Sequence, residues 1–268
     1  MAPQGSPALP ALQLGCAGWS LARAHRDRFG AADSQLASYA TRLPAVEINS
    51  SFHRPHRRET YERWAASTPP QFRFSAKCPK TITHELRLQQ AMPALDGFLA
   101  QAAGLGPKLG CLLIQLPPSL GFDAASARRF VMGLRARHDG AVALEARHPT
   151  WFDAAADRLL ARARIARVLA DPVLFPAAAV PGGWPQLVYL RLHGSPRRYW
   201  SRYDDALLRQ LAERLAVAQR SGARCWCIFD NTAAGEAVPN ALTLQGMMAT
   251  LASGPCPVAQ PAHSSRTP

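Results

Sequence analysis

The feature that most constrains this chain is a series of eight short apolar runs that recur along it with helical patterns between them. Short apolar runs are typical of buried strands, and strands that alternate with helices predict parallel βαβ units. Eight such units predict an α/β fold, namely a single-domain (β/α)8 barrel of the TIM type. The runs are residues 12–18, 45–49, 73–77, 110–115, 142–146, 165–171, 187–193 and 224–231.

The segments between the runs predict the helices of this barrel. Ser34, Asp123, Asp153 and Asp204 precede amphipathic stretches and are good N-cap residues. The proline-rich segment 172–185 predicts a loop or a short helical turn instead. The predicted helices are residues 34–42, 57–67, 93–104, 124–138, 153–164, 204–220 and 237–251.

An open, doubly wound sheet is the alternative architecture. Neither a GxGxxG segment after the first run nor a P-loop supports it. No internal linker stands out, so one barrel domain is expected over residues 11–252. The flanking segments 1–10 and 253–268 are rich in proline, serine, glycine or alanine, and we expect them to be disordered.

The strong positive charge bears on the partners of the chain. The 268 residues carry a formal net charge of +13, which favours an anionic partner such as a nucleic acid or an anionic small molecule. Only Lys77, Lys80 and Lys108 are lysines, and an arginine-rich, lysine-poor chain also results from nucleotide composition bias. Both interpretations stay open, and the oligomeric state is not predicted.

Cysteine usage and hydropathy indicate the compartment. The six cysteines form no CxxC pair, as expected for small buried residues in a reducing environment. The first residues show no charged segment followed by an apolar core, and no run approaches the ~18 apolar residues of a membrane span. A cytoplasmic protein with no membrane partner is therefore expected.

Polar side chains gather at the ends of the predicted strands, where the active sites of such barrels lie. Because side chains alternate along a strand, Glu145 and Arg147 share one face, as do Arg191 and His193. If these faces point into the barrel, the side chains converge on one mouth. Two interpretations remain for any single pair, a binding site or a structural ion pair that neutralises the interior.

These strand ends supply the candidate site residues. Acid–base chemistry by glutamate and histidine is physically plausible, and arginine and lysine suit an anionic substrate. The candidate catalytic residues are Glu145, His193 and Glu47. The candidate substrate-binding residues are Asn49, Lys77, His84, Gln115, Arg147, Arg191, Tyr199, Asn231 and Trp19.

A cofactor is not specified by the sequence. Glu145, Asp171, Glu47 and His193 include good ligand types for a divalent metal, so such an ion is possible. No HExxH or comparable spacing supports it, and nearby arginines compete for the carboxylates. No residue is therefore assigned as a metal ligand.

The loop GSPRRYWSRY, residues 194–203, mixes arginines with aromatic residues. Loops after the seventh and eighth strands often hold phosphate in such barrels, and basic residues interleaved with aromatics also hold single-stranded nucleic acid. The plain alternative is a loop whose aromatics cover the rim of the barrel.

Seven segments, taken together, resemble the YecE-like family (domain of unknown function 72). They keep the family's order and cover nearly the whole chain, and the resemblance implies a TIM-type barrel. The family's name states no activity, so no reaction follows from it. Cys16-Ala17 and His53 stand where similar proteins usually show Thr-Ser and Tyr. The segments are GCAGWS (15–20), AVEINSSFHRP (45–55), FRFSAKCPKTITH (72–84), LGCLLIQLPPS (109–119), VALEARHPTWF (142–152), YLRLHG (189–194) and FDNTAAGEAVPNA (229–241).

Three functions remain open at this level. The first is a hydrolase-like enzyme that acts on an anionic or phosphate-bearing substrate at the mouth of the barrel. The second is a nucleic-acid-binding barrel, such as a repair-type nuclease. The third is a non-catalytic ligand-binding protein. The fold cannot decide among them, because this barrel supports many chemistries.

Overall fold

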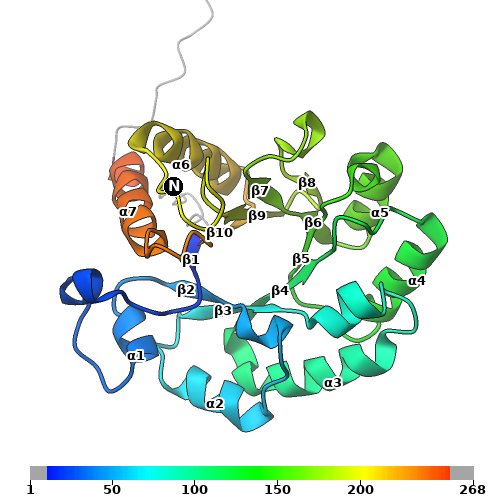
Figure 1. Ribbon diagram of the computed structural model, residues 1–268, viewed down its shortest axis with the longest axis horizontal. Coiled ribbons are helices and arrows are strands. Elements are labelled where there is room, and N and C mark those ends of the chain that lie inside the picture. Colours follow the sequence, from blue (N-terminus) through cyan, green and yellow to red (C-terminus); the bar gives the residue numbers. More distant parts are fainter. Residues whose placement is uncertain (1–10, 254–268) are drawn as a thin grey trace, which may run out of the picture.

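The computed structural model describes residues 11–253, and these form the predicted α/β barrel (Figure 1). Parallel strands make the central ring, with helices around its outside. The strands are β1 (Gln13–Ala17), β2 (Ala45–Ile48), β3 (Arg73–Lys77), β4 (Leu109–Gln115), β5 (Val142–Glu145), β6 (Ile165–Arg167), β7 (Leu169–Asp171), β8 (Gly182–Gly183), β9 (Leu187–Leu192) and β10 (Arg224–Phe229). The helices are α1 (Gln35–Tyr39), α2 (Arg58–Ala66), α3 (Met92–Ala102), α4 (Ala124–Arg135), α5 (Ala154–Arg162), α6 (Asp205–Arg220) and α7 (Ala237–Ser253).

The sixth barrel strand is interrupted at Val168, and this break divides it into β6 and β7. β6 pairs with β5, and β7 pairs with β9, both in parallel. The backbone N–H of Val168 still donates to Leu144 O at 2.9 Å, so the segment 165–171 joins the two sides of the ring. The short strand β8 adds an antiparallel edge to β6. The proline-rich segment before β9 forms this edge and a single 3-10 turn, Pro176–Ala178.

The helix caps follow the sequence expectation in three of four places. The side chains of Ser34, Asp123 and Asp204 accept hydrogen bonds from the backbone N–H three residues further on. The side chain of Asp153 makes no such bond. The predicted tail 253–268 is wrong at its first residue, because Ser253 belongs to helix α7. The rest of that tail and the predicted tail 1–10 lie outside the described residues.

Two kinds of core fill the barrel. Two clusters pack the outer faces of the strands against helices, with members such as Leu36 and Leu208 from the helices. A third cluster contains no residue of a helix and fills the inside of the ring. Its members include Ala45, Ala143 and Ile228. Because side chains alternate along a strand, Glu47, Glu145 and Asp230 lie on the same inner face, two residues closer to the carboxyl ends.

Gly15 allows β1 and β2 to approach each other closely. The Tyr39 hydroxyl accepts a hydrogen bond from the N–H of Cys16 at 2.8 Å and donates to Ala45 O at 2.9 Å. A Cβ atom at Gly15 would overlap with Ala45 O and would lie 2.9 Å from the Tyr39 hydroxyl oxygen. The junction of the first two strands therefore requires glycine at this position.

We predict that Gly15→Ala destabilises the fold by about 3 kcal/mol or more, because overpacking against backbone must push two strands apart. Gly97→Ala is the matched control, since a Cβ at Gly97 in α3 meets no atom within 4 Å. The control should gain roughly 0.5–1 kcal/mol from helix propensity. Urea unfolding followed by circular dichroism measures both, and equal stability of the two variants would contradict this account.

Candidate functional site at the barrel mouth

Arg191 on β9 is the centre of the mouth, and its guanidinium contacts three carboxylates. Nε and Nη2 donate to Glu47 Oε2 and Oε1 at 2.9 and 2.6 Å. Nη1 donates to Glu145 Oε2 at 2.7 Å, and Nη2 also donates to Asp230 Oδ2 at 3.1 Å. The Arg191 side chain is 0% exposed. A buried guanidinium is stable only when charged acceptors surround it, and here the planar fork is fully occupied.

His193 lies two residues further along the same strand direction and joins two of these carboxylates. Its Nδ1 is 2.9 Å from Asp230 Oδ2, and its Nε2 is 3.3 Å from Glu145 Oε1. Burial opposes the charged imidazole, but the hydrogen bonds to Asp230 and Glu145 outweigh it, and the pKa of His193 is raised. A carboxylate oxygen at each ring nitrogen fits the imidazolium, because both nitrogens then donate.

The carboxylates stay ionised in this setting. Burial opposes ionisation of Glu145, but Arg191, His193 and Arg147 together hold its pKa well below its ordinary value. Asp230 is likewise buried, and mainly Arg191 and His193 lower its pKa. Every acceptor oxygen of Glu145 is engaged, since Oε1 accepts from Arg147 and Oε2 from Arg191. Glu145 is therefore a weak base in this arrangement.

Glu47 is also fully engaged. Both of its oxygens accept from Arg191, and the Tyr189 hydroxyl lies 3.0 Å from Oε2. The same hydroxyl lies 2.8 Å from Ser75 Oγ, so the contacts continue inward along β3. Glu47 is completely buried. Its position orients Arg191 and leaves no oxygen directed to a ligand.

Lys77 is the cation of the mouth that pairs with no carboxylate among residues 11–253. Its Nζ donates to Asn49 Oδ1 at 3.0 Å and lies 4.2 Å from the ring centroid of Phe52. The residue is 5% exposed. Burial and the nearby charge of Arg191 outweigh the carboxylates and lower the pKa of Lys77 to about 8.

His84 packs on the same aromatic ring as Lys77. It belongs to a π-helical turn, Thr81–Glu85, and its ring meets Phe52 edge-on with centroids 5.0 Å apart. Thr83 Oγ1 lies 2.8 Å from His84 Nδ1, and Nε2 has no partner within the described part of the chain. Partial burial, Lys77 and Arg147 lower the pKa of His84, which favours the neutral ring.

Arg147 and Gln115 complete this side of the mouth. The Nε and Nη2 of Arg147 donate to Glu145 Oε1 at 3.1 and 3.0 Å, whereas Nη1 meets no acceptor in residues 11–253. Its side chain is 15% exposed. Gln115 is adjacent to Glu145 in the strand register, and its amide forms no hydrogen bond with another described residue.

Three of the candidate binding residues have other surroundings. Asn231 follows the inward Asp230 and therefore turns outward, where its Nδ2 lies 3.0 Å from Ser201 O and 2.9 Å from Asn240 Oδ1. Trp19 packs edge-on against Trp64 at 5.0 Å. Tyr199 is 39% exposed and meets the edge of the His193 ring at 5.7 Å, so it covers the mouth.

The candidate residues chosen from the sequence did not include Asp230, which is buried and contacts Arg191 and His193. The signal was present in the sequence, because Trp226, Ile228 and Asp230 alternate toward one face of the last strand. Asn231 was selected in its place. The same alternation directs Asp171 outward, where its Oδ1 accepts from the Tyr203 hydroxyl at 2.8 Å.

The structure shows what surrounds Cys16 and the loop 194–203, two features that stand out in the sequence. Cys16 points into the core between the sheet and the helices, and burial raises its pKa to about 12. In the loop 194–203, Arg197 stacks on Trp200 at 4.4 Å and Tyr203 is buried. Neither Cys16 nor Tyr203 faces the inside of the mouth.

No group of three or more His, Cys, Asp or Glu side chains in residues 11–253 is arranged to hold a metal ion. Of the four ligand types considered from the sequence, Asp171 lies on the outer face of its strand. The carboxylates of Glu47 and Glu145 are bound by Arg191. Among the same residues, no helix is both long enough and apolar enough to cross a bilayer.

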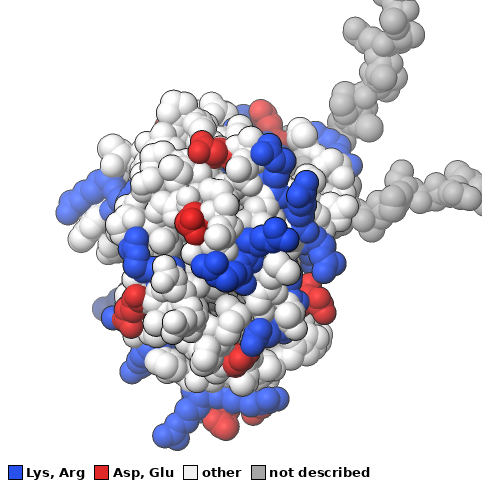
Figure 2. Space-filling view, turned by 90° about the vertical axis from the view of Figure 1, so that its right-hand side faces the viewer, with Lys and Arg blue, Asp and Glu red and all other residues white. Residues whose placement is uncertain are grey.

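A second, separate hollow lies between α4 and α5 on the outside of the barrel. It encloses about 520 Å³ over an apolar floor that includes Val131 and Leu159. Figure 2 shows the side of the molecule on which α4 and α5 lie in Figure 1, with basic side chains near the middle of that face. We call this hollow the arginine groove; its arginines are Arg128, Arg135, Arg158, Arg162 and Arg164.

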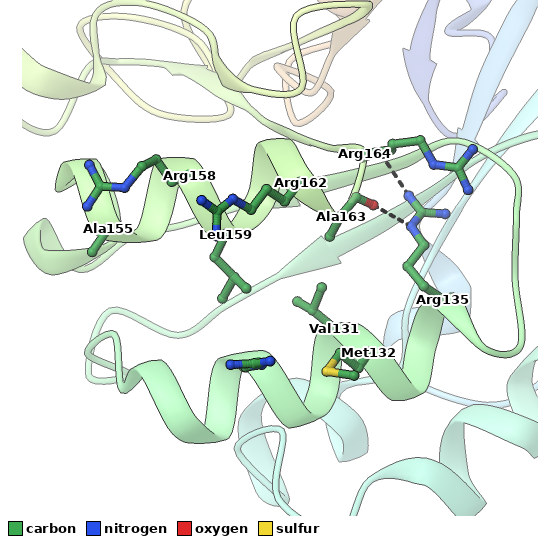
Figure 3. A pocket seen from close by; sticks show the side chains of 10 residues that line it. Val131, Met132, Arg135, Ala155, Arg158, Leu159, Arg162, Ala163 and Arg164 are labelled. Atoms are coloured by element: carbon green, nitrogen blue, oxygen red, sulfur yellow. Dashed lines mark hydrogen bonds between the residues drawn. The ribbon is translucent and has the colours of Figure 1, made fainter.

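The arginines of the groove differ in their partners (Figure 3). Arg135 donates to Ala163 O and Arg164 O at 2.7 and 2.8 Å and so ties α4 to the end of α5. Arg128, Arg158 and Arg162 form no hydrogen bond or ion pair with the described residues and are exposed. The groove is therefore a second surface on which an anion could lie.

The fold and the mouth define a TIM-type barrel protein with a buried ionic cluster at the carboxyl ends of its strands. The profile of the DUF72 family, described as a protein of unknown function, matches residues 13–264, and the chain belongs to this family. The family expected from the sequence is thereby confirmed.

Particular relatives agree with this assignment. The chain is 30% identical over 120 residues to the UPF0759 protein YecE of Escherichia coli K12, a match that spans 44% of this chain and 43% of that protein. A DUF72 family protein of Enterococcus faecalis superposes with a TM-score of 0.75 at 23% identity, covering 89% of this chain and 96% of the other. A Thermotoga maritima DUF72 protein gives 0.72 at 23%, with 89% and 99% covered. These structures support the fold.

We predict that Arg191→Met destabilises the protein by about 3–5 kcal/mol, because it leaves buried carboxylates without their common cation. Arg58→Met is the control, since the Arg58–Glu62 pair is an exposed i,i+4 pair on α2 and should contribute less than about 0.5 kcal/mol. Chemical unfolding of both variants tests this. A loss below 1 kcal/mol at Arg191 would contradict the ionic cluster.

The pKa shifts predict a pH dependence with two sides. For Glu145 and Asp230 the folded pKa is depressed, so their stabilisation is present above the ordinary values of 4.5 and 3.8 and is lost as pH falls. For His193 the folded pKa is raised, so its stabilisation is present below 6.5 and is lost as pH rises through the folded pKa. The cluster should stabilise most between these limits.

The His193→Gln variant tests the predicted loss of stabilisation as the pH rises. The difference in unfolding free energy between wild type and variant should be largest near pH 6 and should shrink as pH rises, because the neutral imidazole loses its advantage. Urea unfolding at intervals from pH 5 to 9 measures this difference. A difference that stays constant or grows with pH would mean that His193 is not an imidazolium in the folded protein.

Proposed function

We propose that the protein is an enzyme that binds a small anionic substrate at the mouth of the barrel and transfers protons there with Lys77 and His84. The observation that carries the proposal is a row of unused hydrogen-bond donors on three consecutive strands. Lys77 ends β3, Gln115 ends β4, and Arg147 follows β5. Each retains donor capacity that no described residue fills.

The unpartnered donors of Gln115 and Arg147 are not sealed off from solvent, so an entering ligand can reach them and replace the water that they contact. Arg191, in contrast, uses its donors on Glu47, Glu145 and Asp230. We call Arg191 and its three carboxylates the inner layer of the mouth, and Lys77, Gln115 and Arg147 the outer layer. The donors of Arg191 are thus all used within the inner layer, whereas the outer layer keeps donors that no described residue fills. The groups of the outer layer are a guanidinium nitrogen, an ammonium and an amide, all suited to carboxylate or phosphate oxygens.

The charge balance of the mouth supports an anion. With His193 as an imidazolium, four cations face three carboxylates, so the cluster carries one excess positive charge. The cations are Arg147, Arg191, His193 and Lys77, and the carboxylates are Glu47, Glu145 and Asp230. A bound monoanion would neutralise this excess, and low local polarity strengthens the attraction.

The residues proposed here for proton transfer differ from the candidates named from the sequence, which are Glu145, His193 and Glu47. Glu145 and Glu47 have their oxygens engaged, and both ring nitrogens of His193 lie against carboxylates. Lys77 has a pKa near 8, and His84 is neutral with a ring nitrogen available. A catalytic base acts best when its pKa is close to the working pH, which favours Lys77, and the neutral ring of His84 can accept a proton at its unpartnered nitrogen.

Anion binding is the direct test. We expect small carboxylates, or inorganic phosphate, to raise the melting temperature of the wild type at low ionic strength. Arg147→Gln should weaken binding about tenfold to a hundredfold, because a charge-assisted hydrogen bond contributes roughly 1.5–3 kcal/mol. Isothermal titration with the anion that gives the largest thermal shift measures the ratio.

Arg158→Gln in the arginine groove is the matched control and should leave the affinity unchanged, since Arg158 is an exposed arginine on the outside of the barrel and not at its mouth. The reverse pattern would place the anion in the groove and contradict the proposal. Tight binding of DNA or RNA, with an affinity that falls steeply with salt and depends on Arg158, would instead favour the nucleic-acid function. Binding at the mouth with no turnover of any bound anion would favour a non-catalytic binder.

A further inference from the structure

Lys77 has surroundings that suit a covalent role and exceed what anion binding requires. An anion-binding lysine is normally a permanent ammonium, whereas the Lys77 amine is removed from water, lies near Arg191 and pairs with no carboxylate in residues 11–253. Neighbouring positive charge and burial favour the neutral amine, which is the nucleophilic form.

The side chain is held in place on two sides. Asn49 Oδ1 accepts from Nζ at 3.0 Å, and the Phe52 ring lies 4.2 Å below it. His84 packs on the same ring, with its Nδ1 fixed by Thr83 and its Nε2 without a partner in the described chain. The two side chains share the Phe52 ring, and the charge of Lys77 acts on His84, so the neutral imidazole is placed to accept the proton that the ammonium must lose.

We infer that Lys77 forms an imine with the carbonyl group of a 2-oxo acid whose carboxylate is bound by Arg147 and Gln115. The inference rests on the proposed function, because the same outer layer of donors holds the carboxylate. A 2-oxo acid combines the anionic group that Arg147 Nη1 can bind with an electrophilic carbon next to it. Of the three lysines of the chain, only Lys77 ends a barrel strand.

The step balances without an oxidant or reductant. The ammonium gives one proton to His84, and the amine nitrogen attacks the carbonyl carbon, so an N–C bond forms. A second proton moves from nitrogen to the former carbonyl oxygen. The His84 imidazolium then protonates the hydroxyl, the C–O bond breaks, and water leaves behind a protonated imine.

Reductive trapping tests the inference on the full chain. The protein is incubated near pH 7.5 with pyruvate, glyoxylate or 2-oxoglutarate and sodium cyanoborohydride, which delivers hydride to the imine carbon. We expect an adduct on the peptide containing Lys77, heavier by the 2-oxo acid less one oxygen atom. Lys77 should be labelled at least about tenfold faster than Lys80, since lowering the pKa of Lys77 from 10.5 to about 8 raises its neutral fraction about tenfold per pKa unit.

The controls separate this inference from the proposed function. Lys80→Arg removes an exposed lysine of the same segment and should keep the adduct, whereas Lys77→Arg should lose it. Arg147→Gln should slow trapping of pyruvate and leave trapping of acetone, which lacks the carboxylate, unchanged. The unmodified wild type serves as its own reference, because Lys77, Lys80 and Lys108 compete in one molecule.

Each failure has its own meaning. Labelling of Lys80 and Lys108 at the rate of Lys77, or no adduct on Lys77 with any of the three acids, overturns the imine. If a 2-oxo acid binds and Arg147→Gln abolishes the binding while no adduct forms, the proposed anion site stands and only the covalent step is wrong. If no anion of any kind binds at the mouth, the proposed function itself fails.

Discussion

The buried guanidinium of Arg191 is the constraint on which the mouth of this barrel depends. Removing a charged group from water costs several kcal/mol, and only surrounding charged acceptors offset it. Three strands supply those acceptors, namely β2 with Glu47, the end of β5 with Glu145, and the residue after β10, Asp230. The cluster therefore fixes the relative positions of strands from both halves of the chain. Lys77, Gln115 and Arg147 project from a scaffold whose charges are already arranged.

A binding site and a structural ion pair are not mutually exclusive interpretations of the polar residues at the mouth. Glu47, Glu145 and Asp230 form the ion pairs that the cautious interpretation of the sequence suggested. They occupy Arg191, bring His193 to its charged form, and leave the outer cations in excess. The pairs are thus a positioning layer below the outer donors. This arrangement explains why the acids, whose oxygens are engaged, are poor catalytic candidates, and why Lys77 and His84, which pair with no carboxylate of the described residues, are better ones.

The fold could be predicted from the sequence because the apolar runs and the alternation within them report burial directly. The inner layer was predictable in part, since Glu145 and Arg147 share a face by spacing alone. The break at Val168 was not, because a single interrupted residue leaves the apolar run intact. The choice between Asn231 and Asp230 depended on which residues of the last strand face the inside of the barrel. Which oxygens Arg191 would saturate could not be read from the chain, because those contacts join residues that are 39 to 144 positions apart.

The titration of Lys77 tests the central claim, that this cation of the mouth is buried without a carboxylate partner among residues 11–253. Because the chain contains three lysines, 13Cε-lysine labelling gives three NMR signals, and the Lys77→Arg variant identifies the one of interest. The account predicts a midpoint near pH 8 for Lys77, against its ordinary value of 10.5. A Lys77 midpoint at 10.5 would mean that the amine is solvated or paired like any surface lysine. The mouth would then lack the readily deprotonated amine that the proposed imine requires.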